Sequence, residues 1–139
     1  MHVILLALFL LGSANGSNAS GTTGPQVDRV KECESLSGPP GSSVTVHGRL
    51  YAANGGGSGF RIWLVGTHRI VWLSPRIAPA IPDAILGLFK PFDEELYGDF
   101  RLVPLAPDRP GFMREMCFVS ADKLVVRDTR TGKAWYTKQ

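Results

Sequence analysis

Cysteine is scarce in this sequence, which holds only Cys33 and Cys117 among its 139 residues. Neither lies in a CxxC pair or in another spacing typical of zinc ligands, which argues against a thiolate zinc site. A lone pair of cysteines in an oxidising compartment most simply forms a disulfide. We therefore expect a Cys33–Cys117 bridge, with two buried free thiols or a reactive thiol as the alternatives.

The sequence also lacks any block of clustered basic residues. Fifteen Lys and Arg residues stand against twelve Asp and Glu residues, which gives a formal net charge of +3. Proteins that bind nucleic acid or heparin usually gather their cationic side chains in one patch or stripe. We therefore do not expect a nucleic-acid partner.

Long hydrophobic runs are missing except for VILLALFLLG at residues 3–12. A run of about ten residues is too short to cross a bilayer core of about 30 Å as a helix. Its position and the small residues after it are typical of a secretory signal. We expect a signal peptide over residues 1–19, a secreted or periplasmic protein, and no membrane span in the mature chain. No Lys or Arg precedes the run, so an uncleaved amphipathic or buried segment is the alternative.

Turn-forming residues are plentiful, with sixteen glycines and ten prolines. Residues 20–43 are rich in Gly, Ser, Thr and Pro, a composition that buries little apolar surface. This segment is predicted to be a flexible lead-in until Cys33 holds it. Residues 44–139 are then predicted to form a single β-barrel domain.

The first strands of that domain are predicted from alternation. Residues 44–51 alternate apolar and polar side chains, and residues 60–65 and 68–73 flank a two-residue turn at Gly66-Thr67. In this register Arg61 faces Trp72 and Trp63 faces Ile70. The aliphatic side of the hairpin is expected in the core: Phe60, Ile62, Val71 and Leu73.

The rest of the chain completes a fold that is mainly β. A short helix is predicted from Pro82 to its stop at Pro91, and the acidic residues 93–97 are read as a further helical turn. Later strands are expected in three further stretches, residues 100–105, residues 113–120 and a closing hairpin over 124–137. This order resembles a five-stranded OB-like barrel, with its helix between strands three and four and a C-terminal hairpin. An irregular barrel or sandwich with another strand order is the alternative.

Short pieces of the sequence carry a further resemblance: Gly48-Arg-Leu50, Arg61-Ile-Trp63, Gly66-Thr67 with Arg69, Gly98-Asp-Phe100 and the Cys117 strand. With these pieces the chain resembles small secreted bacterial proteins of unassigned function. The resemblance implies secretion and one β-rich domain. It implies no activity, cofactor or catalytic residue.

Catalytic signatures are also missing. No serine lies in a GxSxG elbow, and His47 and His68 follow no HExxH spacing. We therefore predict no metal site and no cofactor. The alternative is a small secreted hydrolase or metal-dependent enzyme that uses His47, His68 and acids of residues 93–99, such as Asp93, Glu94, Glu95 and Asp99.

The strongest functional candidate is the polar side of the first three strands. Aromatic rings interleaved with cations suit stacking on a sugar and contact with an anionic group. The predicted binding residues are Tyr51, Arg61, Trp63, His68 and Trp72, with His47 and Arg49 beside them. The sequence thus favours a secreted, non-catalytic binding or adaptor module for a glycan, an envelope polymer, another anionic ligand or a protein. Burial of both tryptophans under the helix or the C-terminal hairpin is the competing interpretation.

Overall fold

The computed structural model describes residues 25–37, 42–54 and 59–137, and the predicted signal peptide lies outside them. The fold is mainly β, with six strands in one sheet and two helices in the described part of the chain. The elements in order are α1 (Pro25–Leu36), β1 (Val44–Ala52), β2 (Phe60–Leu64), β3 (Ile70–Leu73), α2 (Asp83–Leu86), β4 (Glu94–Pro104), β5 (Arg114–Asp128) and β6 (Ala134–Tyr136).

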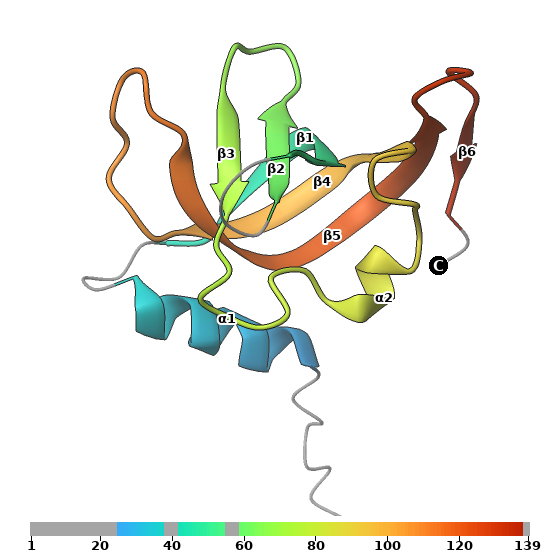
Figure 1. Cartoon of the computed structure of the whole chain (residues 1–139). Coiled ribbons are helices and arrows are strands. Elements are labelled where there is room, and N and C mark those ends of the chain that lie inside the picture. Colours follow the sequence, from blue (N-terminus) through green and yellow to red (C-terminus); the bar gives the residue numbers. More distant parts are fainter. Residues whose placement is uncertain (1–24, 38–41, 55–58, 138–139) are drawn as a thin grey trace, which may run out of the picture.

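The strands follow the order β3-β2-β1-β4-β5-β6 in the sheet, with antiparallel pairing between these neighbours. β3 also pairs with β5, in parallel, so the pairings among β1 to β5 run in a cycle. Figure 1 shows the long, bent ribbons of β4 and β5, with β2 and β3 rising beside them and β6 at the far end. The sheet has six strands rather than the five of the predicted barrel. The sixth strand, β6, pairs with β5 as the last strand of the predicted C-terminal hairpin.

The predicted register of the β2–β3 hairpin is confirmed. Arg61 pairs with Trp72, Ile62 with Val71 and Trp63 with Ile70. The turn is longer than two residues, since the amide of Leu64 donates to the carbonyl of Arg69 and the amide of Thr67 donates to Leu64. The hydroxyl of Thr67 also bonds the carbonyl of Leu64, and it accepts from the amide of Arg69. These local bonds stabilise the wider turn without changing the register.

The acidic stretch before Gly98 is a strand and not the helical turn that the sequence predicted. β4 begins at Glu94, and every second residue from Leu96 to Leu102 is buried. Alternate burial has the period of a strand, and it places Leu96 and Phe100 in the core. The predicted helix shortens accordingly, to the single turn Asp83–Leu86.

β5 is one strand of 15 residues where the sequence predicted two. The predicted break falls at Ala121–Lys123, where Lys123 has a positive φ of 52°. Pairing with β4 continues on both sides of this irregularity, and the register shifts between Tyr97 and Asp99. A bulge of this kind bends a strand without ending it.

The segment predicted as a flexible lead-in contains helix α1, which lies along β5 (Figure 1). The expected disulfide is present, and it joins Cys33 of α1 to Cys117 of β5. Arg29 adds hydrogen bonds from its guanidinium to the carbonyls of Phe118, Pro79 and Ala80. Burial lowers the pKa of Arg29, and nearby Glu32 opposes this shift. The helix is therefore held by contacts with residues far along the chain.

The core lies on the inner side of the sheet. It is built by buried side chains of all five strands in the cycle, together with two residues that flank α2: Leu50, Ile62, Val71, Leu73, Ile81, Phe89, Leu96, Phe100, Leu102, Met116, Phe118, Leu124 and Val126. A second cluster of Cys33, Val103, Cys117 and Val119 lies where α1 covers the outer side. None of the helices in the described ranges is long and apolar enough to cross a membrane.

Candidate functional site

The outer side of β1, β2 and β3 carries five half-buried side chains that we call the aromatic–cationic face: Arg49, Tyr51, Arg61, Trp63 and Trp72. Alternation positions them, because the residues between them, such as Leu50, Ile62 and Val71, point into the core. Cross-strand pairing joins them, since Arg49 pairs with Trp63 and Tyr51 pairs with Arg61. The face is therefore continuous across three strands.

Arg49 organises this face. Its guanidinium carbon lies 5.3 Å from the centre of the Tyr51 ring and 5.0 Å from that of Trp63. An ion pair of 3.4 Å between the Nη1 atom of Arg49 and Glu95 holds the guanidinium from the side of β4. The two rings and the cation between them thus form one ordered layer.

Arg61 contributes a cation that is not neutralised. It lies between Tyr51 on β1 and Trp72 on β3. Across residues 25–37, 42–54 and 59–137, no hydrogen bond or ion pair to its guanidinium is found. This cation remains available to an anionic group that approaches the face.

The indole N–H groups of Trp63 and Trp72 differ in their hydrogen bonding. The Nε1 atom of Trp63 donates to the carbonyl of Thr67 at 2.7 Å, which fixes the ring against the β2–β3 turn. The Nε1 atom of Trp72 is buried and has no partner in the described part of the chain. Neither ring belongs to the buried core, so both are half-buried surface residues rather than core residues.

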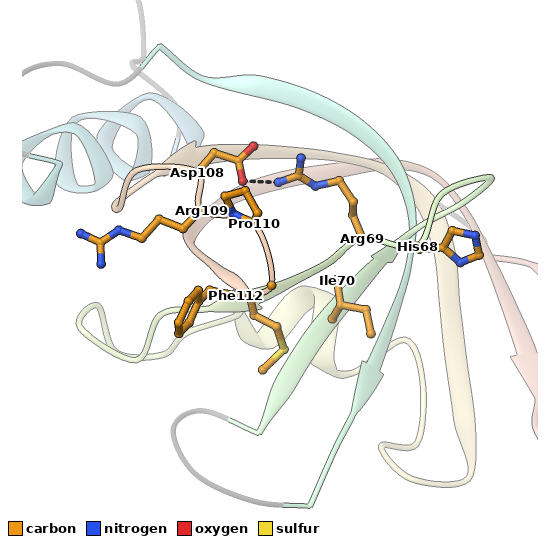
Figure 2. Close-up of a pocket in the computed structure, with 9 residues that line it drawn as sticks. His68, Arg69, Ile70, Asp108, Arg109, Pro110 and Phe112 are labelled. Atoms are coloured by element: carbon orange, nitrogen blue, oxygen red, sulfur yellow. Dashed lines mark hydrogen bonds and ion pairs between the residues drawn. The ribbon is translucent and has the colours of Figure 1, made fainter.

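His68 is the one predicted binding residue that lies outside this layer. It is exposed on the β2–β3 turn, and Figure 2 shows its ring pointing away from the side chains around it. The structure thus brings together Tyr51, Arg61, Trp63 and Trp72, and it places His68 at their border.

A groove of about 640 Å³ opens next to this border, between the β2–β3 turn and the loop from β4 to β5. It is lined by His68, Arg69 and Ile70 on one side and by residues 108–113 on the other. Arg69 reaches across to form an ion pair with Asp108 (Figure 2). This contact lowers the pKa of Asp108 and raises the pKa of Arg69.

The residues of the alternative, enzymatic hypothesis are only partly brought together. The Nδ1 atom of His47 lies 2.9 Å from Asp99, and Lys123 bonds the other oxygen of this carboxylate at 2.9 Å. The hydrogen bonds from Lys123 and His47 lower the pKa of Asp99. His68 and Glu94 are not part of this group. Glu94 instead accepts from the backbone amide of Lys90.

A metal centre is not formed by these residues. In the part of the chain that the structure describes, no three His, Cys, Asp or Glu side chains come close enough to hold a metal ion. Glu95 forms an ion pair with Arg49. This contact draws Glu95 away from the other acids of residues 93–99. The His47–Asp99 pair is an imidazole oriented by a carboxylate, which by itself lacks a nucleophile.

Sequence reasoning missed two features of the site. The sequence predicts Arg49 beside the binding residues, whereas in the structure its guanidinium lies near the rings of both Tyr51 and Trp63. The groove residues Arg109 and Phe112 lie between the predicted strands of residues 100–105 and 113–120, where the sequence predicts no binding site. Arg49 alternates with the buried Leu50 on β1, and this alternation indicates that Arg49 lies on the same face as Tyr51. The loop between β4 and β5 has no such periodicity, so the sequence gives no signal for the groove.

Comparison with known proteins adds no relative. No protein-family model matches the chain, and no similar protein was found among curated proteins or solved structures.

Proposed function

We propose that this protein is a secreted, non-catalytic binding module whose aromatic–cationic face takes an anionic saccharide chain, such as a glycan or an envelope polymer. The aromatic rings of Tyr51, Trp63 and Trp72 supply stacking surfaces for sugar rings. Arg61 supplies the charge for a carboxylate or a similar anionic group. An anionic saccharide contacts both the aromatic rings and the cation of the face.

The observation that carries the proposal is the position of Arg49 between Tyr51 and Trp63. A cation held between two rings fixes their orientation before any ligand arrives. Preorganisation of this kind lowers the entropy that a ligand must remove on binding. Glu95 neutralises Arg49, so the net positive charge of the face comes from Arg61.

The proposed fold supports a binding site at the aromatic–cationic face. We propose that the cycle of pairings β1-β2-β3-β5-β4 is a five-stranded OB-like barrel to which β6 is appended. Helix α2 lies between β3 and β4 in the chain, as the helix of such barrels does. OB-type barrels bind oligosaccharides and oligonucleotides across their second and third strands. Three of the five residues of the face, namely Arg61, Trp63 and Trp72, lie on these strands.

Secretion is part of the proposal. It is supported by the Cys33–Cys117 disulfide, because such bonds persist in oxidising compartments. The apolar run of residues 3–12, read as a signal peptide, supports it as well.

A titration of tryptophan fluorescence tests this function. Polygalacturonate oligomers serve as the anionic probe, and cello-oligosaccharides of equal length serve as the neutral control. We expect the anionic probe to quench the emission and to bind at least tenfold more tightly. Arg61→Ala combined with Trp72→Phe should abolish this binding, while Arg130→Ala, an exposed cation in the β5–β6 turn, should not change it. Equal binding of both probes, or no effect of the double substitution in a folded variant, would contradict the proposal.

A second candidate function, a small hydrolase, rests on the contact between His47 and Asp99 at 2.9 Å. A carboxylate that orients an imidazole is a recurring part of acid–base catalysis. A screen with chromogenic ester and glycoside substrates tests it, with His47→Ala as the paired variant. Turnover that the substitution removes would support the hydrolase, and equal rates in both proteins would eliminate it.

A further inference from the structure

We propose that the groove between the β2–β3 turn and the β4–β5 loop is a second binding surface, which docks an acidic peptide segment that carries apolar side chains. The groove adjoins the aromatic–cationic face through Ile70, which pairs with Trp63. The proposal does not depend on what that face binds. Combined with the saccharide site proposed above, it makes the protein an adaptor between a polymer and a protein partner.

The first observation is the exposure of large apolar side chains on one loop. Phe112 is 74% exposed and Met113 is 46% exposed, and both line the groove with the half-buried Ile70. Figure 2 shows Ile70 between the β2–β3 turn and the loop that bears Phe112. Adjacent apolar side chains that are left open to solvent around a hollow are typical of a protein-interaction site.

The second observation is the sign of the charge around these side chains. Arg69 and Arg109 are the cations that line the groove, and Asp108 is the one acid among its lining residues. Arg69 already neutralises Asp108, and Arg114 adds a further attraction to this carboxylate. The guanidinium of Arg109 is exposed, and no hydrogen bond or ion pair to it is found among the residues that the structure describes. The groove therefore complements a segment with negative charge.

The choice of a peptide over a saccharide follows from the kind of apolar surface. Besides the ring of Phe112, the groove offers Met113 and Ile70, whose flexible or branched side chains pack well against other apolar side chains. Sugar rings instead stack on flat aromatic faces, which this protein gathers on the neighbouring strands. An acidic peptide with apolar side chains suits both the cations and the apolar side chains that line the groove.

The occupant binds by its side chains and not by adding a strand. β3 pairs with β2 and β5, and β5 pairs with β3 and β4 next to the groove. Backbone groups of both bordering strands are thus already used, so strand addition has no free edge here. Affinity should depend on a few anchor side chains, with Phe112 and Arg109 as the protein's own contribution.

Fluorescence anisotropy with a labelled peptide pool tests the proposal. The pool permutes the residues of Asp-Glu-Phe-Asp-Leu-Glu, and two control pools replace either every acid by Lys or both apolar residues by Ser. We expect the acidic, apolar pool to bind and both control pools to bind at least tenfold more weakly. Phe112→Ser and Arg109→Ala should each weaken the binding at least tenfold. Tyr136→Ser, which removes an exposed ring on β6, should leave it unchanged.

The outcomes of these experiments distinguish the peptide proposal from the saccharide proposal. Arg61→Ala with Trp72→Phe should retain peptide binding, so a failed saccharide experiment does not bear on the groove. If no member of the acidic pool binds more tightly than its controls, or if Phe112→Ser has no effect, the peptide proposal is wrong. Loss of polygalacturonate binding in Phe112→Ser, without any peptide binding, would assign the groove to the saccharide instead.

Discussion

The guanidinium of Arg49 lies 5.0 Å from the centre of the Trp63 ring, directly across the β1–β2 pairing. The same guanidinium lies near the ring of Tyr51, two residues further along β1. One cation thus orders two rings on the solvent side of the sheet. This arrangement is the structural basis of the proposed binding face.

A double-mutant cycle between Arg49 and Tyr51 measures this contact. We expect Arg49→Met and Tyr51→Leu to show a coupling of about 0.5–1 kcal/mol in the free energy of unfolding, the range of exposed cation–π pairs. Chemical denaturation of the four proteins supplies the values. Glu95→Gln is the control, since it removes the ion pair of Arg49 and keeps both rings. Purely additive effects of the two substitutions would show that the cation does not hold the ring.

Gly48 is required by a close approach inside the sheet. A Cβ atom at this position would lie 2.4 Å from the Cγ2 atom of Ile62 and 3.1 Å from the carbonyl oxygen of Trp63. We expect Gly48→Ala to lower the free energy of unfolding by about 1–3 kcal/mol, because overpacking forces neighbouring atoms to move. Thr45→Ala, at an exposed position of β1, should change it by less than about 0.5 kcal/mol. Equal unfolding midpoints for the two variants would refute this account of the packing.

The disulfide should be a major source of stability. It joins residues separated by 84 positions in the sequence, so it removes much of the conformational freedom of the unfolded chain. The chain-entropy model gives roughly 4–5 kcal/mol for such a loop. We expect Cys33→Ala with Cys117→Ala to lose about this amount in urea denaturation, and reduction of the native protein should have a similar effect. An unchanged midpoint in both experiments would contradict the prediction.

The stability contributed by Asp99 should depend on pH. Lys123 and His47 hold its pKa below the ordinary value of 3.8, so the unfolded chain takes up a proton before the folded protein does. The contribution is therefore complete above the ordinary value and is lost as pH falls through the lower, folded-state pKa. We expect the difference in Tm between native protein and Asp99→Asn to be present near neutral pH and to vanish in strong acid. A difference that grows on acidification would have the wrong sign.

The β2–β3 hairpin shows what the sequence could predict. Alternation over residues 60–65 and 68–73 located the strands, and Gly66, with a positive φ of 78°, marked the turn between them. The observed pairing of Arg61 with Trp72 followed from these two signals alone. Residues that share a side of a strand could therefore be assigned to a face without any coordinates.

Helix α1 shows what the sequence could not predict. Most of its residues are polar, and its anchors are the bridge from Cys33 to β5 and the hydrogen bond from Arg29 to Phe118, 89 residues away. Contacts of that range leave no local periodicity to read. The groove was missed for a related reason, since Arg109 and Phe112 gain their setting only when the loop folds against the β2–β3 turn.

The central claim concerns where the saccharide binds, and the indole N–H signals of the three tryptophans test it most directly. Trp63 and Trp72 lie on the proposed face, whereas Trp135 lies on β6. In two-dimensional ¹H–¹⁵N spectra, a titration with polygalacturonate oligomers should shift the signals of Trp63 and Trp72 and leave that of Trp135 in place. A shift of Trp135 alone, or no shift of any indole at a concentration that saturates binding, would contradict the account.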